Sequence, residues 1–326
     1  MTAAPLLSVS DLTIDIPLGG RTLHAVRGVS FEVSRGETLC IVGESGSGKS
    51  LTSLALMNLL PGRLKRAAAA MSFDGIDLLS IPERRMSDLR GDRMAMIFQE
   101  PMTSLNPAYT IGNQLTEAFL RHRKTTRKEA FGRAVYLLEK VGITAADRRM
   151  KQYPHQLSGG LRQRVMIAMA LMCEPDLLIA DEPTTALDVT IQAQILLLLK
   201  DLQKELGIAI ILITHDLGVV ARIADRVAVM YAGELVESGP AAPLFQSPAH
   251  PYTRGLLECI PQPGKTRPGE PLGSIPGLVP SLTGRVSGCV FRNRCPRAEE
   301  ACSGEVPVVA FGDARRVRCL FAEGVR

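Results

Sequence analysis

Residues 43–50 read GESGSGKS, and their types and spacing match those of a loop that binds phosphate. Glycines let backbone N–H groups turn inward onto phosphate oxygens, and a helix that begins after them directs the positive end of its dipole at the anion. A Gly/Ser-rich loop without function is the alternative, but an apolar segment precedes this loop and a helical segment follows it. We therefore expect a nucleotide site formed by Gly43, Ser45, Gly46, Gly48, Lys49, Ser50 and Leu51.

Two carboxylates, Asp181 and Glu182, end the apolar segment LLIADE. Mg²⁺ prefers oxygen ligands, so Asp181 can hold the ion through water. Glu182 is then the expected general base for the attacking water. An exposed acidic pair at the end of a strand is the alternative, and the phosphate-binding loop favours catalysis over it.

Two further polar residues follow apolar segments. His215 comes after residues 208–213, and Gln99 stands in the string IFQEP. A histidine in that place can contact the terminal phosphate, and a glutamine between a strand and a helical region can sense Mg²⁺ and water. The alternatives are that His215 is an ordinary surface histidine and that Gln99 is a polar residue without a function. The expected catalytic residues are Glu182, His215 and Gln99, and the expected magnesium ligands are Ser50, Gln99 and Asp181.

These residues lie at the ends of alternating strands and helices, which predicts an α/β core with a parallel sheet. Pro61-Gly62 is expected to end the helix that begins at Lys49. A mostly helical stretch, about residues 100–165, separates two strand–helix series and predicts an inserted helical subdomain. The expected strands are Leu6–Ile14, Leu23–Val33, Thr38–Val42, Leu177–Ala180 and Ile208–Ile213, and the expected helices are Lys49–Leu60 and Thr190–Leu206.

The composition narrows the class of protein. Hydrophobic residues make up 46% of the 326 residues, enough for a substantial core, but no apolar run approaches the roughly 20 residues of a membrane-spanning helix. The N-terminus lacks the pattern of a secretory signal, so we expect a cytoplasmic protein with at most peripheral membrane contact. The net charge is +5 without an aromatic-rich basic stripe, so nucleic acid is not an expected partner.

The last part of the chain differs in composition. Residues 261–288 contain six prolines and six glycines, which predicts a connector without regular structure. Four cysteines then follow, and in a cytosolic protein such a group favours metal over disulfides. Their spacing is wider than that typical of structural zinc and does not by itself choose between zinc and a [4Fe–4S] cluster. These cysteines are Cys289, Cys295, Cys302 and Cys319.

Five motifs, taken in order and spacing, resemble those of ABC ATPases over about residues 6–240. They are Gln99 in its string, LSGGLRQR at 157–164, LLIADE, TALD at 185–188 and His215. The resemblance implies a P-loop (RecA-like) core with an antiparallel β portion, and two cassettes that close head to tail around ATP. The residues that it places at ATP are Asp188, Ser158, Gly159 and Gly160, the last three at the ATP of the other cassette. Leu161 stands where the signature usually has Gln, and Ile16 where an aromatic residue usually stacks on adenine.

Longer strings, among them IFQEPMTSLNP, IADEPTTALDV and SPAHPYTRGLL, resemble the ATP-binding subunits of the dipeptide, oligopeptide and nickel import family, with the D-type subunit the nearest likeness. The resemblance implies an ATPase that powers peptide import at the cytoplasmic face of a bacterial inner membrane. Its implied partners are two membrane-spanning permease subunits, a sister ATP-binding subunit and, indirectly, an extracytoplasmic binding protein. It implies ATP and Mg²⁺, and a [4Fe–4S] cluster on the four cysteines in preference to zinc.

This interpretation divides the chain into a cassette at 1–240 and a cysteine-bearing extension at 241–326. Residues Met102–Pro107, beside Gln99, are the expected contact with the permease. The same machine could import nickel chelates or glutathione-like compounds. A soluble ABC ATPase is a further alternative, although the chain has neither a second cassette nor a long coiled coil. A redox or regulatory protein is the last alternative, and the presence of Glu182 and His215 argues against it.

Overall fold

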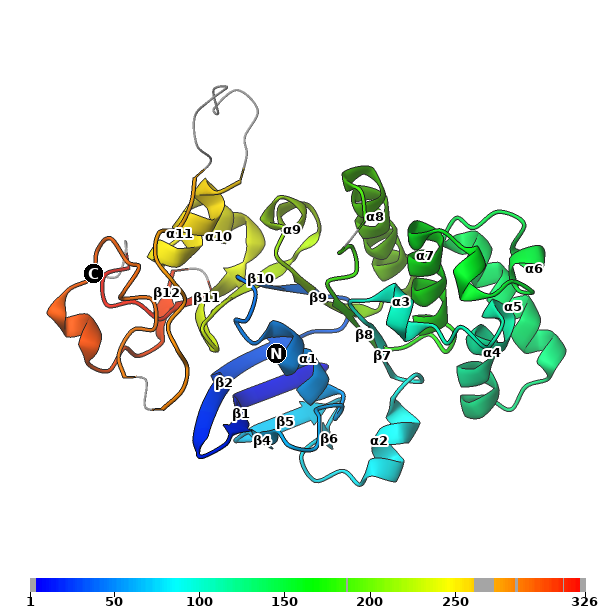
Figure 1. The fold of residues 1–326 in the computed structure, drawn as a ribbon, viewed down its shortest axis with the longest axis horizontal. Coiled ribbons are helices and arrows are strands. Elements are labelled where there is room, and N and C mark those ends of the chain that lie inside the picture. Colours follow the sequence, from blue (N-terminus) through cyan, green and yellow to red (C-terminus); the bar gives the residue numbers. More distant parts are fainter. Residues whose placement is uncertain (1–3, 186, 261–272, 285–286, 313, 323–326) are drawn as a thin grey trace. The chain divides into compact units, whose positions relative to one another are not determined.

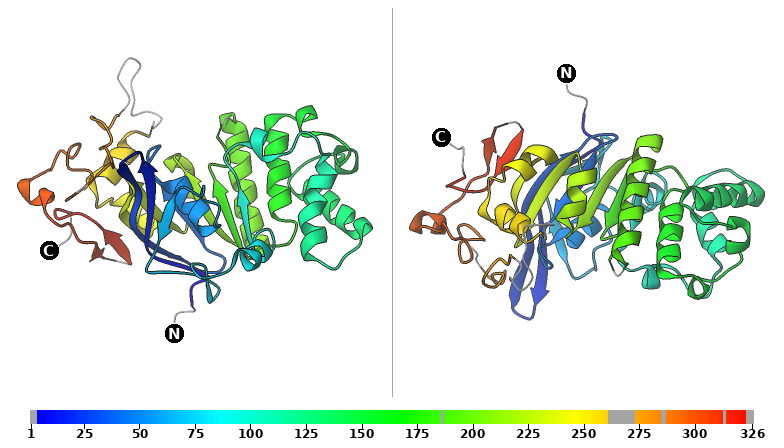
Figure 2. Two further views of the ribbon diagram at one scale, coloured as in Figure 1. Left: turned by 60° about the horizontal axis from the view of Figure 1, so that its bottom comes forward. Right: turned by 90° about the horizontal axis from the view of Figure 1, so that it is seen from above.

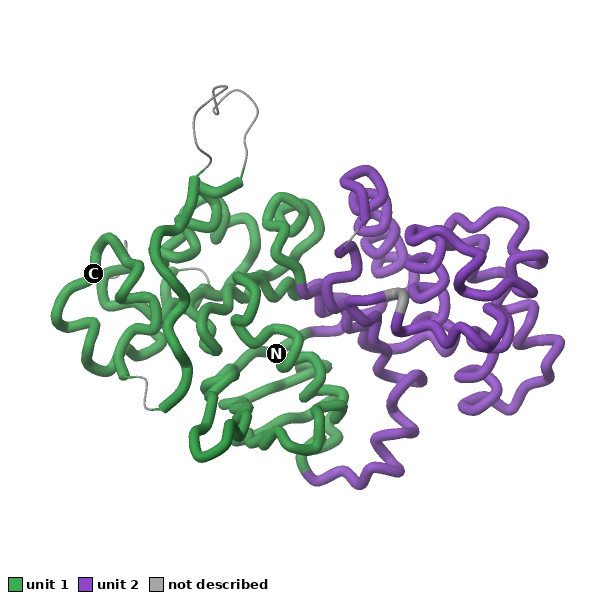
Figure 3. Tube along the Cα trace, viewed as in Figure 1, with its two compact units in different colours: residues 1–33, 39–79, 214–326 green, residues 34–38, 80–213 purple. Residues whose placement is uncertain are grey.

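The computed structural model describes residues 4–185, 187–260, 273–284, 287–312 and 314–322. The chain forms two compact units (Figure 3). The first comprises residues 1–33, 39–79 and 214–326, and the second comprises residues 34–38 and 80–213.

An antiparallel sheet forms the N-terminal part of the first unit (Figure 1). It has the order β2-β1-β5-β6, and β4 also pairs with β1. Apolar and polar residues alternate at the start of β1, so Leu7 and Val9 are buried on one face. The strands are β1 (Leu7–Leu18), β2 (Arg21–Val33), β4 (Lys65–Ala67), β5 (Ala70–Phe73) and β6 (Ile76–Asp77).

The first unit also contains strands in the order β12-β13-β11-β10-β3. β3 is buried along its whole length and runs parallel to β10, as its uninterrupted apolar run predicts. β13 pairs with β11, so the C-terminal tail extends this sheet. The strands are β3 (Thr38–Val42), β10 (Arg226–Tyr231), β11 (Glu234–Pro240), β12 (Val309–Phe311) and β13 (Arg315–Val317).

The tail packs on the first unit through a small apolar cluster of its own. Phe311, Val317 and Ala322 are buried against Ala249, and Cys319 borders the cluster. Figure 2 shows this orange and red tail beside the yellow helices. The helices of the unit are α1 (Lys49–Leu56), α9 (Leu217–Ile223), α10 (Ala241–Gln246) and α11 (Pro251–Glu258), with a 3-10 turn at Glu300–Ser303.

The second unit combines three parallel strands with a group of helices. The strands β7 (Met94–Ile97), β8 (Leu177–Asp181) and β9 (Ala209–Thr214) pair in this order. α4, α5 and α7 pack on one another and form the expected helical part (Figure 2). The helices are α2 (Glu83–Leu89), α3 (Pro101–Ser104), α4 (Ile111–His122), α5 (Arg127–Lys140), α6 (Ala146–Arg149), α7 (Gly159–Ala170) and α8 (Val189–Leu206), with a 3-10 turn at Pro154–Gln156.

Local sequence explains how these helices begin and end. The side chain of Thr126 accepts a hydrogen bond from the backbone of Glu129, whose side chain accepts one in return, and this capping box starts α5. Two expected boundaries were wrong by four residues, because β1 continues to Leu18 and not to Ile14, and α1 ends at Leu56 and not at Leu60. Asn58 adopts a left-handed backbone conformation (φ +52°), which ends the helix before Pro61-Gly62 is reached. Among the described residues, no helix has the length and apolar character needed to cross a bilayer.

Candidate active site

The phosphate-binding loop connects β3 to α1 and is shaped by two glycines. Gly43 has φ +151°, and a Cβ atom there would lie 2.1 Å from the carbonyl oxygen of Met230. Gly48 has φ +101°, and its Cβ atom would lie 2.7 Å from the carbonyl oxygen of Ala25. Any side chain at either position would therefore collide with backbone, so the loop needs glycine at both ends.

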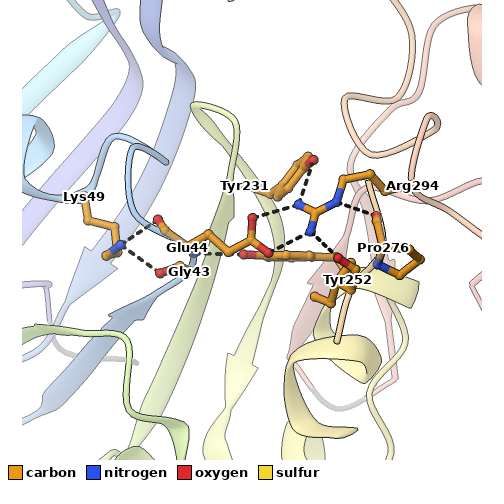
Figure 4. A network of polar contacts seen from close by, with 8 residues as sticks. Gly43, Glu44, Lys49, Tyr231, Tyr252, Pro276 and Arg294 are labelled. Atoms are coloured by element: carbon orange, nitrogen blue, oxygen red, sulfur yellow. Dashed lines mark hydrogen bonds and ion pairs between the residues drawn. The ribbon is translucent and has the colours of Figure 1, made fainter. Parts of the chain in front are cut away.

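Lys49 is buried at the start of α1, with its ammonium group inside the loop. Its Nζ donates hydrogen bonds to the carbonyl oxygens of Gly43 at 2.8 Å and Glu44 at 2.9 Å (Figure 4). It also donates to Ser47 Oγ at 3.4 Å. These acceptors compensate the buried charge. Ser45 and Gly46 are exposed at the crest of the loop. The predicted loop residues are thus brought together by one strand–loop–helix connection.

His215 belongs to the same unit and follows β9 directly. Its side chain is exposed. The next residue, Asp216, caps α9 by accepting hydrogen bonds from the backbone of Gly218 at 3.0 Å and Val219 at 3.3 Å. The strand before His215 and the capped helix after it fix its backbone on both sides.

The second unit brings Gln99 and Glu182 into direct contact. Gln99 Nε2 donates a hydrogen bond to Glu182 Oε2 at 3.1 Å, and Asp181 lies beside them, 5% exposed, at the end of β8. Thr185 also binds this group, because its Oγ1 donates to Glu182 Oε2 at 2.8 Å. Sequence reasoning missed Thr185 as a site residue, although it stands only three residues after the predicted base.

Glu182 has a strained backbone. Its φ is +45°, which is rare for a residue with a side chain, and its N–H donates to the carbonyl oxygen of Ile213 at 2.9 Å. Such strain persists only where the surrounding structure holds it, and it concentrates at functional sites.

The expected signature residues lie at the start of α7. Ser158 caps the helix, and its hydroxyl accepts a hydrogen bond from the backbone N–H of Leu161 at 3.4 Å. Leu161 makes this contact through its backbone N–H, which any residue other than proline provides. Leucine in place of the usual glutamine therefore leaves the cap intact. Ser158 and Gly159 are exposed, which leaves the helix N-terminus accessible. Asp188 likewise caps α8, accepting from the backbone of Ile191 at 3.0 Å.

The four C-terminal cysteines line one pocket of the first unit. The pocket walls also include His250, Phe291 and Val306. None of these cysteines forms a disulfide. Burial, together with the charge of the neighbouring thiols, raises the pKa of the Cys289 thiol to about 11. Such thiols become ligands only when a cation stabilises the thiolate. Within the described residues, no three His, Cys, Asp or Glu side chains already have the arrangement that holds a metal ion.

His250, on the wall of this pocket, was not expected from the sequence. It is 1% exposed, and its Nδ1 accepts a hydrogen bond from the backbone N–H of Tyr252 at 3.0 Å. The proton of the neutral ring is therefore on Nε2. Nε2 has no hydrogen-bond partner in the described part of the chain. A buried donor of this kind destabilises the fold unless an acceptor reaches it.

Comparisons with known proteins agree with these features. The ABC transporter family model matches residues 26–185, and the model of the oligopeptide/dipeptide transporter C-terminal region matches residues 236–302. The dipeptide transport ATP-binding protein DppD of Bacillus subtilis is 50% identical, over 96% of this chain and 94% of that protein. The oligopeptide transport ATP-binding protein OppD of Salmonella typhimurium is 49% identical, over 97% and 93%. The chain belongs to this family of transport ATP-binding proteins.

A solved structure supports the fold assigned to this chain. A dimeric ATP-binding cassette in a post-hydrolysis state, bound to ADP and Pi, has a TM-score of 0.66 and 27% identity, and the match covers 72% of this chain and 98% of that one. The expected family and the ABC ATPase fold with its antiparallel portion are confirmed. The chain is an ABC ATPase whose hydrolysis serves transport. The soluble ABC ATPase and the redox regulator are not favoured by these relatives.

Proposed function

We propose that this ABC ATPase powers the import of peptides. The observation that carries the proposal is identity of about half the residues to dipeptide and oligopeptide transport proteins over more than nine-tenths of the chain, including its C-terminal region. Import of nickel chelates or glutathione-like compounds is the alternative within the same machine. The substrate does not touch this subunit, so the assignment rests on these relatives.

Each predicted residue has a role in the proposed mechanism. The amides of the loop and the Lys49 ammonium bind the ATP phosphates and stabilise the charge that develops on transfer. Ser50, Gln99 and Asp181 would hold Mg²⁺, which neutralises phosphate charge when bound. Glu182 accepts a proton from water as the water oxygen attacks the γ-phosphorus and the bond to the ADP oxygen breaks. Gln99 orients the carboxylate of Glu182, and His215 contacts the transferred phosphate.

We propose that a second cassette completes the reaction. Ser158, Gly159 and Gly160 present the start of α7 to the ATP held by a sister ATP-binding subunit, and Asp188 also contributes to nucleotide binding. Two permease subunits would bind near Met102–Pro107, the segment that follows Gln99. An extracytoplasmic binding protein would deliver the peptide. In this arrangement the chain lies at the cytoplasmic face of the bacterial inner membrane.

We also propose that the four cysteines hold a [4Fe–4S] cluster, with zinc as the alternative. Three observations support the fit: the four thiols share one pocket, no disulfide competes for them, and the buried N–H of His250 requires an acceptor there. A cluster offers sulfur acceptors to such a donor. It would act as a structural staple in the extension at 241–326, outside a cassette at 1–240, because the Pro/Gly-rich segment builds little core.

Metal analysis tests the cluster. The complex, purified without oxygen, should contain iron and acid-labile sulfide in equal amounts, about four of each per chain. Zinc without iron or sulfide would refute the cluster. The matched control is a chain in which Cys295 and Cys302 are replaced by serine, which should lose both elements.

The transport function is tested on the intact complex. A tag on this chain should co-purify permease subunits, and the reconstituted complex should hydrolyse ATP faster when the binding protein carries its ligand. Dipeptides, longer peptides and chelated nickel are added in turn. Stimulation by peptides supports the proposal, and stimulation by nickel chelates alone refutes it. If no membrane partners co-purify and no ligand changes the rate of ATP hydrolysis, the soluble ATPase is favoured.

A further inference from the structure

Arg294, in the C-terminal tail, reaches the phosphate-binding loop. Its side chain is 6% exposed and forms a two-pronged ion pair with Glu44, the second residue of the loop (Figure 4). Nη1 lies 2.7 Å from Glu44 Oε2, and Nη2 lies 3.1 Å from Oε1. Paired parallel hydrogen bonds of this kind fix orientation as well as distance. The tail therefore determines where the Glu44 side chain lies.

The tail holds the guanidinium group of Arg294 rigidly in turn. Its Nε donates to the carbonyl oxygen of Pro276 at 3.0 Å and its Nη2 to that of Ile275 at 2.9 Å. Nη1 also donates to the hydroxyl of Tyr231 at 3.3 Å, at the end of β10. Every nitrogen of the group thus has a fixed acceptor. Because the guanidinium group is fixed in this way, the position of the tail segment around Arg294 determines the position of the Glu44 side chain.

The backbone of Glu44 connects this pair to the nucleotide site. Its N–H donates to the hydroxyl of Tyr252 at 2.9 Å, and its carbonyl oxygen accepts from Lys49 Nζ at 2.9 Å. Tyr252 is buried in α11. Glu44 is therefore fixed by its side chain and its amide to the C-terminal region, and its carbonyl in turn holds the lysine that meets the phosphates.

We propose that Arg294 is a positioning residue for ATP binding. It does not touch the nucleotide. It holds Glu44, and through Glu44 it keeps Lys49 and the loop amides in the arrangement that fits phosphate. The cassette therefore depends on the tail for its affinity for ATP. Chemistry after binding depends on Glu182 and Gln99, which belong to the other unit, so Arg294 acts on ATP binding more than on turnover.

The test measures the kinetics of ATP hydrolysis by the whole complex. Arg294→Met should raise the KM for ATP by about tenfold and change kcat by less than about threefold, because the loop is misplaced while the general base is intact. Arg294→Lys, which keeps the charge but not the two-pronged contact, should give an intermediate KM. Arg316→Met is the matched control, because Arg316 is an exposed arginine of the same tail, and it should leave both constants unchanged.

A second variant approaches the pair from the loop. Glu44→Gln removes the charge and keeps the shape, and it should also raise the KM. The double variant Glu44→Gln/Arg294→Met should be no worse than the poorer single variant, because both break one interaction. An unchanged KM in folded Glu44→Gln complex would overturn the proposal. The proposal would also be overturned if the fold-changes in KM of the two single variants multiplied in the double variant. The same holds if both variants lost thermal stability without any rise in KM.

Discussion

The hydroxyl of Thr185 donates a hydrogen bond to the carboxylate of Glu182 at 2.8 Å, three residues earlier in the chain. Gln99 donates to the same carboxylate oxygen, Oε2. Glu182 also has a left-handed backbone, so both its main chain and its side chain are held in one orientation. In its proposed role as general base, a side chain fixed in this way loses little entropy when water is positioned for attack.

Thr185→Val should lower kcat by about tenfold and leave the KM for ATP nearly unchanged. Valine has the shape of threonine but cannot donate, and a hydrogen bond to a charged group contributes about 1.5–3 kcal/mol. The measurement is steady-state ATP hydrolysis by the complex. Thr185→Ser keeps the hydroxyl and should retain most of the rate. A valine variant with full kcat would show that Thr185 has no part in orienting the base.

Glu182→Gln should abolish nearly all turnover while ATP still binds. Glutamine keeps the size of the side chain and can still receive the hydrogen bonds from Thr185 and Gln99 through its carbonyl oxygen, but it cannot take a proton. Turnover and equilibrium binding of ATP are measured on the same preparation. Undiminished hydrolysis would refute the assignment of Glu182 as the base.

Gly43→Ala should remove ATP binding. A Cβ atom at this position would lie 2.1 Å from the carbonyl oxygen of Met230, so the loop must shift away from its phosphate-binding form. Gly132→Ala in α5 is the matched control, since nothing lies within 4 Å of the added Cβ. That control should bind ATP normally and gain helix stability of about 1 kcal/mol. Normal binding by the Gly43 variant would show that the loop tolerates a side chain.

Sequence patterns predicted this site where the chemistry is local to one segment. The loop from Gly43 to Ser50 follows β3, and Asp181 is the last residue of β8, so both segments lie at the ends of buried strands, as their apolar runs predicted. The contact of Arg294 with Glu44 could not be predicted, because 250 residues separate the partners and only the packing of the tail unites them. His250 was missed for the same reason, since nothing in its neighbours indicates a buried ring on the cysteine pocket.

His250→Asn should weaken the proposed cluster without unfolding the tail. The asparagine oxygen can still accept from the backbone of Tyr252, but the N–H that the ring keeps buried is lost. Hydrogen bonds to cluster sulfurs raise the reduction potential and protect the cluster. We expect the variant to have a lower reduction potential and to lose iron faster in air. The loss of iron is monitored by the visible absorbance of the cluster. A variant with unchanged potential and iron content would mean that Nε2 has no cluster acceptor.

Cys295→Ser should raise the KM for ATP, although Cys295 belongs to the C-terminal tail and not to the loop. Cys295 follows Arg294 directly and lines the cysteine pocket, so loss of a metal centre there would release the segment that aims the guanidinium group. The expected change is a rise in the KM of about tenfold, as for Arg294→Met, together with loss of iron. Cys173→Ser, in the second unit, is the control and should keep iron and KM. If iron is lost and the KM stays normal, the Arg294–Glu44 pair positions the loop without help from the metal centre.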